Sequence, residues 1–497
     1  MSIQSVTICR RPYLKHAFWA VCCGLVLFSQ PLLGQTKSEP WNQFRGPNGY
    51  GSVADASIPS EFGPNKNLIW KTELPNGFSS PVFHDDKMYL TAEENKELVT
   101  ICYSKTDGHE VWRQVAPRNR TERLDPRNHP ASSSPVVNEH GVFVFFPDYG
   151  MVAYDHQGTE RWRQPLGPFN NIYGMGASPI AVDGLLVLVC DQNLNSFVIG
   201  MDQQSGETVW KTKREEATSG HCSPIVYQAN PEASKEIIVA GSFNLTSYDL
   251  KSGKKNWWVG GLCFEMKSTP VVLGDTAFIN GFGSPMNEVD QNYQVADFAE
   301  VVAEHDADKN GVLGGKEMPN ELARNFFPAV DLDENKALNE DEWKYFQASI
   351  ASKNSMMAIR LGGSGDMTLE NTKWKYHKNI PQLPSPLLAG QQVLMVSDRG
   401  VLTSLDAETG KPYFKGRIPG CTGNFYASPV SAGDKVLIAT TAGKIAVLQA
   451  SAILADGELT VLAVNELEGD IYATPAIVDN QLFVRTTTTL YCFGEKK

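Results

Sequence analysis

A Ser-Pro or Thr-Pro pair recurs eight times along this 497-residue chain, and its spacing limits the folds that the chain can adopt. The steps between successive prolines are 54, 44, 45, 46, 116, 43 and 46 residues, so six of the seven fit a unit of about 45 residues. The step of 116 residues equals one unit plus about 70 further residues. A fixed period of this length indicates a fold built from repeated structural units. The pairs are Ser80-Pro81, Ser134-Pro135, Ser178-Pro179, Ser223-Pro224, Thr269-Pro270, Ser385-Pro386, Ser428-Pro429 and Thr474-Pro475.

Each unit contains the signals of several short strands. Two apolar runs separated by a polar turn follow the proline, as in "SPIAVDGLLVLVC" (178–190), and this pattern predicts a β-hairpin. A third run then leads into a turn in which a glycine precedes an aromatic residue by four positions. Glycine accepts the left-handed backbone of a tight turn, and the aromatic side chain can fill the space between neighbouring sheets. The pairs are Gly108 and Trp112, Gly158 and Trp162, Gly206 and Trp210, Gly253 and Trp257, and Gly410 and Phe414.

Four-stranded sheets repeated radially form a β-propeller, so the sequence predicts an all-β, eight-bladed β-propeller of four-stranded antiparallel blades. The predicted blades cover residues 67–283 and 355–497, and residues 35–66 form an N-terminal segment. The last repeat lacks a fourth strand of its own, and residues 67–75 can supply it. Pairing the two ends of the chain in this way would remove an open sheet edge.

The turn pattern D-x-x-(T/S)-G-x-x-x-W resembles the repeat of the PQQ-like, or quinoprotein, eight-bladed propellers. The stretch "WNQFRGPNGYG" (41–51) is also similar to the N-terminal element of exported bacterial proteins with this repeat. The resemblance covers most of residues 40–497. Three departures occur: Ser104 replaces the usual Asp of the first turn, the second turn is one residue shorter, and the seventh unit lacks the aromatic residue.

The additional residues of the long step, 284–354, contain a stretch that resembles the calcium-binding loop of an EF-hand. In "DADKNGVLGGKE" (306–317), oxygen-bearing side chains alternate with other residues, and Gly311 falls where such a loop turns sharply. Hard oxygen ligands in this order suit Ca²⁺, and Gly314 would contribute a bound water. The predicted ligands are Asp306, Asp308, Asn310, the carbonyl of Val312, and Glu317.

A second loop of the same kind follows as "DLDENKALNEDE" (331–342). Lys336 takes the place of the glycine, which costs backbone freedom and brings a cation near the site, so we expect this loop to be the weaker one. Only 13 residues, 318–330, separate the loops, so one short helix is expected to serve both. This small α-helical pair in blade 5 is predicted to be a calcium-stabilised structural insertion rather than a calmodulin-type switch. Its second set of ligands is Asp331, Asp333, Asn335, the carbonyl of Ala337, Asn339 and Glu342.

Residues 1–34 have the features of an export signal. Arg10 and Arg11 precede an apolar run at 17–28, and the small residue Gly34 offers a cleavage point. A Sec signal and a twin-arginine signal are both compatible with "RRPYLK" (10–15). The protein is therefore predicted to be periplasmic or extracellular, and no other stretch is long enough to span a membrane. The six later cysteines are Cys102, Cys190, Cys222, Cys263, Cys421 and Cys492; apolar runs surround most of them, which favours buried free thiols over disulfides.

Charge and motifs narrow the function. A net charge of −12 disfavours nucleic acid as a partner. The resemblance implies two alternatives: a quinoprotein dehydrogenase that holds PQQ and Ca²⁺ in its central funnel, or a binding propeller similar to BamB. The adjacent cysteines found in many such dehydrogenases occur here only as Cys22 and Cys23, within the signal, and no CxxCH motif is present.

We therefore expect an exported, calcium-binding and non-catalytic binding or scaffold protein, whose partner is a protein or peptide, with a saccharide as a further possibility. The alternative is a PQQ- and calcium-dependent dehydrogenase that oxidises an alcohol or a sugar. No catalytic residue is predicted, since the histidines accompany no nucleophile motif. The stretches 172–179 and 220–224 precede blade starts, and packing is predicted for them rather than a place in a central pocket.

Overall fold

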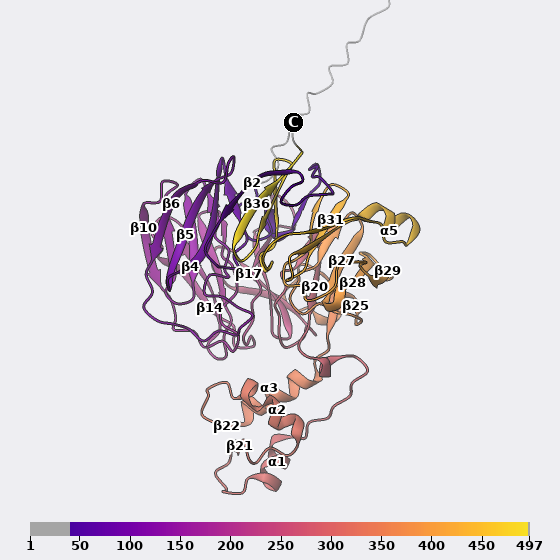
Figure 1. Cartoon of the computed structure of the whole chain (residues 1–497). Coiled ribbons are helices and arrows are strands. Elements are labelled where there is room, and N and C mark those ends of the chain that lie inside the picture. Colours follow the sequence, from indigo (N-terminus) through magenta and orange to yellow (C-terminus); the bar gives the residue numbers. More distant parts are fainter. Residues whose placement is uncertain (1–39, 496–497) are drawn as a thin grey trace, which may run out of the picture. The chain divides into compact units, whose positions relative to one another are not determined.

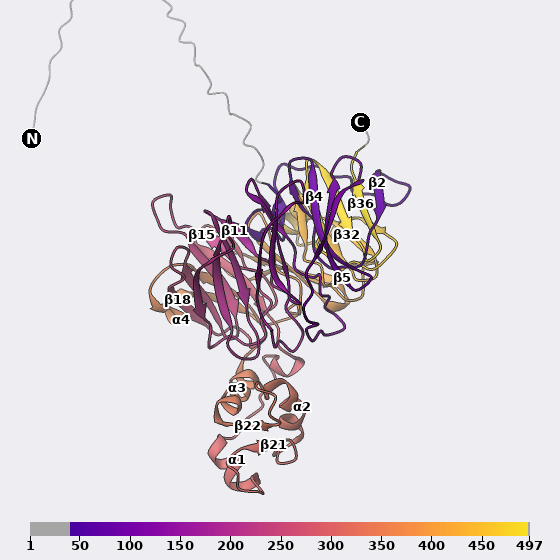
Figure 2. The ribbon, with the colours of Figure 1, turned by 90° about the vertical axis from the view of Figure 1, so that its left-hand side faces the viewer.

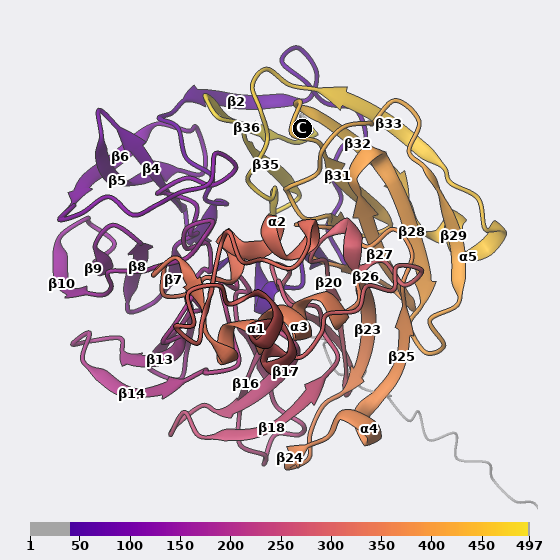
Figure 3. The same ribbon diagram turned by 90° about the horizontal axis from the view of Figure 1, so that it is seen from below.

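The computed structural model describes residues 40–495, and the predicted export signal at 1–34 lies outside the described residues. Figure 1 shows the strands grouped into sheets, and Figure 3 shows these sheets following one another round a central axis. The described part of the chain contains eight blades, and each blade is built on an antiparallel sheet of four strands. This confirms the predicted eight-bladed all-β propeller. No helix among residues 40–495 is both long and apolar enough to cross a membrane.

The first four blades use strands that are consecutive in the chain. Blade 1 contains β3 (Val82–His84), β4 (Lys87–Glu94), β5 (Glu97–Ser104) and β6 (Glu110–Ala116). Blade 2 contains β7 (Val136–Asn138), β8 (Gly141–Phe146), β9 (Gly150–Tyr154) and β10 (Glu160–Pro165). Blade 3 contains β11 (Ile180–Val182), β12 (Leu185–Cys190), β13 (Phe197–Asp202) and β14 (Thr208–Lys213). Blade 4 contains β15 (Ile225–Tyr227), β16 (Glu236–Gly241), β17 (Asn244–Asp249) and β18 (Lys255–Gly260), with β24 (Gly365–Asp366) added in parallel to β18.

The last four blades include the insertion and the closing strand. Blade 5 contains β19 (Val271–Leu273), β20 (Thr276–Gly281), β23 (Ser355–Arg360) and β25 (Thr372–Tyr376). Blade 6 contains β26 (Leu387–Ala389), β27 (Gln392–Ser397), β28 (Val401–Asp406) and β29 (Pro412–Arg417). Blade 7 contains β30 (Val430–Ala432), β31 (Lys435–Ala439), β32 (Lys444–Gln449) and β33 (Val461–Glu466), with β1 (Ser52–Val53) parallel to β30. Blade 8 contains β34 (Ala476–Val478), β35 (Gln481–Arg485), β36 (Thr489–Phe493) and β2 (Leu68–Glu73), so the two ends of the described chain share one sheet.

The helices are short, and three of the five α-helices in residues 40–495 lie in the insertion between β20 and β23. In Figure 2 these three helices, α1–α3, lie below the blades. This insertion holds η2 (Pro285–Asn287), α1 (Phe298–His305), α2 (Glu321–Val330) and α3 (Glu340–Ala351), together with the small antiparallel pair β21 (Leu313–Gly314) and β22 (Ala337–Leu338). The elements outside it are η1 (Pro47–Gly49), α4 (Thr368–Asn371), η3 (Asp398–Gly400) and α5 (Ala450–Asp456). The insertion has its own apolar core around Trp343 and Phe346.

The recurring tryptophans join each blade to the next. The indole Nε1 of Trp162 in blade 2 donates a hydrogen bond of 2.9 Å to the carbonyl of Gln203, in the turn of blade 3. The glycine of that turn, Gly206, has φ +74°, and a Cβ there would lie 2.5 Å from Trp162 Cε3. Glycine is therefore needed for both the turn and the docking of the ring. The same indole-to-carbonyl bond, at 2.9–3.1 Å, is made by Trp70, Trp112, Trp210 and Trp374.

Two of these tryptophans were missed by the sequence pattern, and one predicted member departs from it. Trp70 precedes the first Ser-Pro pair, and Trp374 follows the insertion, so neither stands four residues after a turn glycine of an intact repeat. Trp257 instead donates its indole hydrogen bond to Glu236, in its own sheet. The six later cysteines are all buried and free, as their apolar surroundings predict.

The hydroxyl of the repeated Ser/Thr-Pro pair has a defined role in the ring. The backbone N–H of Ser80 donates to Ser134 Oγ at 2.9 Å, and the N–H of Thr474 donates to Ser80 Oγ at 3.0 Å, which connects the last blade to the first. Among the described residues, seven of the eight steps between consecutive pairs carry this bond, at 2.9–3.0 Å. The following proline has no N–H that would need a partner. The repeat therefore forms a nearly continuous hydrogen-bonded ring round the axis.

The segment 41–53 crosses the axis and contacts several blades. The N–H of Phe83 in blade 1 donates to the carbonyl of Trp41, and the N–H of Val137 in blade 2 donates to the carbonyl of Asn42. Asn48 exchanges two hydrogen bonds of 2.8 Å with the backbone of Val226 in blade 4. The fully buried Arg45 donates from Nη2 to the carbonyl of Pro386 in blade 6, at 2.7 Å. This segment therefore acts as a plug that links blades distant from each other in the sequence.

Candidate functional site

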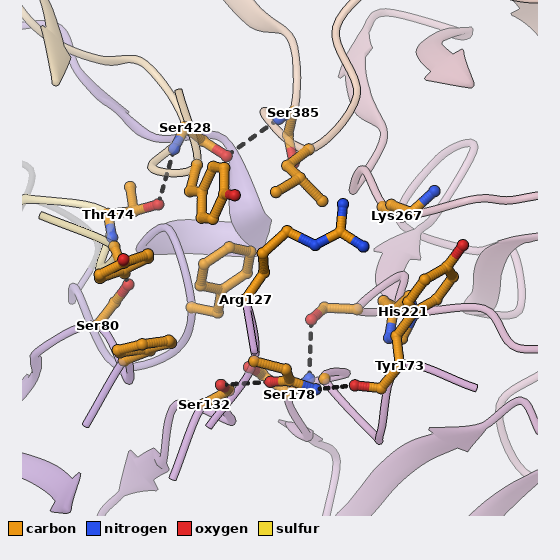
Figure 4. Close-up of a pocket in the computed structure, with 18 of the residues that line it drawn as sticks. Ser80, Arg127, Ser132, Tyr173, Ser178, His221, Lys267, Ser385, Ser428 and Thr474 are labelled. Atoms are coloured by element: carbon orange, nitrogen blue, oxygen red, sulfur yellow. Dashed lines mark hydrogen bonds between the residues drawn. The ribbon is translucent and has the colours of Figure 1, made fainter. Parts of the chain in front are cut away.

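A pocket of about 200 Å³ lies at the centre of the ring (Figure 4). Six of its lining residues are hydroxyl residues of the Ser/Thr-Pro pairs, and the rest come from the loops that enter the blades and from Phe44 of the plug. Tyr173, Gly176 and Ser178 line it, as do His221 and Ser223. The stretches 172–179 and 220–224 thus contribute to a central pocket, and the prediction that they only pack was wrong. The entry loops of a closed ring converge on the axis, which the linear sequence does not display.

One wall of the pocket carries paired charges. Arg127 holds Asp125 in a two-pronged pair, with Nε to Oδ1 at 2.6 Å and Nη2 to Oδ2 at 2.9 Å, and this pair lowers the pKa of Asp125. On the loop between blades 4 and 5, Lys267 forms an ion pair with Glu265, and both side chains are only 7% exposed. Tyr173 lies between the two pairs: its hydroxyl donates to Glu265 Oε1 at 2.8 Å, and the Arg127 guanidinium stands 5.6 Å from its ring centre. The charges compensate one another, so the wall is polar without a strong net charge.

The opposite wall is aromatic. The rings of Phe78 and Tyr472 stack with their centres 4.1 Å apart and an interplanar angle of 13°, and Tyr426 lies 5.4 Å from Tyr472. These residues stand at or just before the start of blades 1, 7 and 8. An aromatic wall facing a polar wall is suited to a ligand that has both an apolar face and hydrogen-bonding groups.

His221 is the histidine of the pocket lining. Loss of water around its ring, together with the nearby positive charge of Lys267, lowers the pKa of His221 to about 3. It is therefore neutral near pH 7 and a weak base. A general base for catalysis near neutral pH needs a pKa closer to the working pH, so this ring is better suited to contacting a ligand than to transferring a proton.

The first acidic loop (306–317) brings three predicted ligands together. Carboxylate oxygens of Asp306, Asp308 and Glu317 all lie within 4.8 Å of one another. Asp306 accepts hydrogen bonds from the N–H groups of Asn310 and Gly311, and the bond from Gly311 makes the largest contribution to lowering the pKa of Asp306. Asn310 donates to Asp308 at 3.1 Å. The loop curls round its own carboxylates, and its backbone carbonyl at Val312 immediately precedes β21.

The second acidic loop (331–342) forms a similar cluster that is more buried. Carboxylate oxygens of Asp331, Asp333 and Glu342 lie within 4.8 Å of one another, and Asp331 and Glu342 are 8% and 3% exposed. Asp331 Oδ1 is buried without a hydrogen-bond partner. Burial, with further repulsion from Asp333, raises the pKa of Asp331, and burial raises the pKa of Glu342. Buried carboxylates with one free oxygen suit a bound cation, which would relieve both the desolvation and the mutual repulsion.

The remaining predicted ligands of this loop occupy different positions. Asn335 donates to Asp333 at 2.9 Å, and Ala337 belongs to β22, which pairs with β21 of the first loop. The side chain of Asn339 accepts hydrogen bonds from the N–H groups of Asp341 and Glu342 and so caps α3. Its oxygen is already used there, so a contribution of Asn339 to a cation would pass through water. Together, the two loops present oxygen donors of the kind that Ca²⁺ prefers.

A family model described as "Outer membrane protein assembly factor BamB" matches residues 63–172, 95–260 and 343–496. These ranges cover more than half of the chain and omit most of the insertion. No curated protein matches the sequence.

Several solved structures have a similar fold. BamB from Moraxella catarrhalis is 11% identical, with a TM-score of 0.52, covering 86% of this chain and 99% of its own. A europium-containing methanol dehydrogenase is 11% identical, with a TM-score of 0.54, covering 92% and 98%. The quinohemoprotein alcohol dehydrogenase from Comamonas testosteroni is 12% identical, with a TM-score of 0.53, covering 92% and 81%. At these identities the likeness concerns the fold alone, and the same fold serves binding proteins and enzymes.

Proposed function

Since this chain belongs to the family described as "Outer membrane protein assembly factor BamB", we propose that it is an exported, calcium-binding propeller that binds a protein or peptide partner and catalyses no reaction of its own. The family description supports the choice of a protein partner, and the features of residues 1–34 support export. The central pocket, with one aromatic and one polar wall, is the place proposed for a segment of that partner. A saccharide is a less favoured ligand of the same pocket.

The single observation that carries the calcium claim is the convergence of three carboxylates in each acidic loop. In both loops these carboxylates stand at positions 1, 3 and 12 of a twelve-residue segment, which is the order of an EF-hand. The two loops pair through β21 and β22, with Leu313 opposite Leu338, so they form one unit. Such sites outside the cytoplasm bind Ca²⁺ at about 10⁻⁴–10⁻³ M and are normally filled there.

The arrangement of the pocket supports binding rather than catalysis. Its charged side chains are neutralised by one another, Arg127 by Asp125 and Lys267 by Glu265, and its histidine is a weak base. Burial and the hydrogen bond to Glu265 raise the pKa of Tyr173, which keeps that hydroxyl protonated. Such groups can orient a ligand. Acid–base catalysis needs a group whose pKa lies near the working pH, and the pKa values of His221 and Tyr173 are shifted away from pH 7.

The proposal is tested by isothermal titration of the calcium-stripped mature protein, first with Ca²⁺ and then with PQQ in excess Ca²⁺. We expect two calcium sites, and the variants Glu317→Gln and Glu342→Gln should each remove one. Titration of the double variant with Ca²⁺ should give no heat of binding. Titration with PQQ should give none with the wild-type protein or with any of the variants. Calcium heat that persists in the double variant would place the metal elsewhere. Tight PQQ binding would favour the dehydrogenase, to be assayed with alcohols and sugars and an artificial electron acceptor.

A further inference from the structure

The insertion touches the ring at the loops that supply the charged wall of the pocket. Arg123 Nη1 lies 3.3 Å from Oε1 of Glu334, a residue of the second acidic loop. Arg123 stands two residues before Asp125 and four before Arg127, in the loop 117–128 that leads from β6 towards β7. The second acidic loop therefore contacts, through a surface ion pair, the segment that carries one of the two charge pairs.

A second contact reaches the other charge pair. The ring of Phe326 in α2 lies 6.4 Å from the ring of Phe264, which directly precedes Glu265. In addition, Tyr345 of α3 meets Phe243 of blade 4 edge-on, with ring centres 6.0 Å apart. Figures 1 and 2 both show α1–α3 on one side of the blades, and in Figure 3 these helices project over the centre of the ring. The insertion thus contacts the loops that frame both halves of the polar wall.

The base of the insertion is firmly attached, so its order can be transmitted to the ring. Asn354 Oδ1 accepts from the N–H of Gly283 at 2.9 Å, and Asn287 Nδ2 donates to the carbonyls of Ser349 and Ser352 at 2.7 and 2.8 Å. These bonds join the entry and exit of the insertion and the end of α3. The second acidic loop lies between α2 and α3, outside these bonds.

The second acidic loop has the buried, unsatisfied oxygen that a cation would complete. Asp331 is 8% exposed and its Oδ1 has no partner, whereas every carboxylate of the first acidic loop is more exposed. Asp331 directly follows α2, and Glu342 lies in the first turn of α3. A cation bound between these two residues would fix the end of one helix to the start of the next, and with them the position of Glu334.

We propose that Ca²⁺ in the second acidic loop orders the loop 117–128 and thereby fixes the Asp125–Arg127 wall of the central pocket, while Ca²⁺ in the first acidic loop does not. This inference rests on the calcium binding proposed above and adds a regulatory role for one of its two sites. It requires no large opening of helices, because the contacts to Arg123 and Phe264 already exist. When one ligand orders a segment that two sites share, its binding changes the affinity or the order of the second site, and this couples the two sites.

The test is hydrogen–deuterium exchange of the full mature chain, measured by mass spectrometry with and without Ca²⁺. Calcium should protect peptides from 306–317 and 331–342. It should also slow the exchange of peptides from 117–128 by about fivefold or more, as a coupling of ordinary size predicts. Glu342→Gln should abolish the protection of 117–128, and Glu317→Gln should keep it. Asp333→Asn serves as a second variant of the same site, in case Glu342→Gln disturbs the capping of α3.

A matched pair of arginine variants isolates the connection. Arg123→Gln should leave the protection of 331–342 intact and remove that of 117–128. Arg163→Gln, which breaks an exposed ion pair with Glu160 on blade 2, should change neither. Protection of the insertion without any change in 117–128 would overturn the coupling and leave the calcium proposal standing. No change in any of these peptides would overturn both.

Discussion

The propeller ring and the insertion at 284–354 belong to one chain, but they are stabilised by different interactions. The ring combines apolar sheet faces with a cycle of backbone-to-hydroxyl bonds and with tryptophans that dock on the next blade. The insertion has a small apolar core and two clusters of carboxylates that repel one another in the absence of a cation. The comparison teaches that a repeat can stabilise itself by closure, whereas an interrupting segment of this size needs an additional cross-link.

Removal of calcium should have the largest effect, and the loss of thermal stability should fall on the insertion, while the ring changes only in the order of the loop 117–128. Two sites with calcium at a hundredfold excess over Kd contribute about 2.7 kcal/mol each. We therefore expect the insertion to unfold at a much lower temperature in a chelator, with loss of helical signal, while the ring transition stays in place. Differential scanning calorimetry with and without a chelator measures this. Equal displacement of both transitions would show that the two regions unfold as one unit.

Trp162→Ala should have the opposite selectivity. It removes the packing of a half-buried ring against blade 3 and the bond to Gln203, at a cost of about 3 kcal/mol to the ring. Calorimetry should show a lower ring transition, and titration should show unchanged calcium binding. Tyr293→Ala, which truncates an exposed aromatic residue of the insertion, is the control and should leave the ring transition unchanged.

Acidification should move the ring and the second acidic loop of the insertion in opposite directions. Burial lowers the pKa of His129 to about 4, and burial with Lys267 lowers that of His221 to about 3, so unfolding takes up protons below the ordinary value of 6.5. The ring should lose about 2 kcal/mol per histidine between pH 7 and pH 4.5. In the calcium-free insertion the pKa values of Asp331 and Glu342 are raised, so the folded insertion binds protons more tightly than the unfolded chain. Protonation of these two carboxyl groups therefore stabilises the insertion at low pH, and this stabilisation is lost as the pH rises through their pKa values.

Calorimetry of the calcium-free protein across this pH range measures both trends. His221→Gln should reduce the pH dependence of the ring. Asp331→Asn should remove part of the gain of the insertion. A common direction for both transitions would contradict the assignment of these groups.

Ser428→Ala should weaken one step of the hydroxyl ring. It leaves the buried N–H of Ser385 without its acceptor, at a cost of about 1–2 kcal/mol to the ring transition. Ser428→Thr should retain stability, because Thr474 plays the same part in the next step. Ser364→Ala, at an exposed turn, is the control. An unchanged transition in Ser428→Ala would mean that water replaces the lost hydroxyl at no cost.

The smallest effect is expected from an exchange within the insertion. Lys336 has φ +71° and Gly311 has φ +81°, so both acidic loops need the left-handed conformation at the same position. Lys336→Gly should relieve about 1 kcal/mol of strain and tighten calcium binding by the second loop, and Gly311→Lys should weaken the first loop by a similar amount. Calcium titration of both variants measures the change. A weaker second loop in Lys336→Gly would show that the lysine contributes more than strain.

Much of the fold could be predicted from the sequence because the repeat carries its own local signals. A turn glycine, an aromatic residue four positions later and a hairpin after each Ser/Thr-Pro pair are contained within single units of about 45 residues. The tryptophans at positions 70 and 374 were missed, because the units that contain them are split by the chain ends or by the insertion. Their role became visible once β2 was found beside β36 and β25 beside β23.

The candidate sites divide in the same way. The carboxylates of each acidic loop are close in sequence, so their grouping follows from the spacing alone. The residues that line the pocket are spread from Phe44 to Thr474, and no spacing rule connects Arg127 with Tyr173 or Lys267. The greater burial of the second acidic loop was not predicted either, since it depends on how α2 and α3 pack.

The sequence by itself determined the period, the number of blades, the turn chemistry and the order of oxygen donors in the two loops, because each of these depends on residues within one unit. The tertiary structure decided which hydroxyl accepts a hydrogen bond from which blade, which loops meet at the axis and where the insertion touches the ring. The bond from Thr474 to Ser80 joins residues 394 positions apart, and the pair Arg123–Glu334 spans 211 positions. Such contacts exist only after the ring has closed, since closure is what brings distant loops to a common axis.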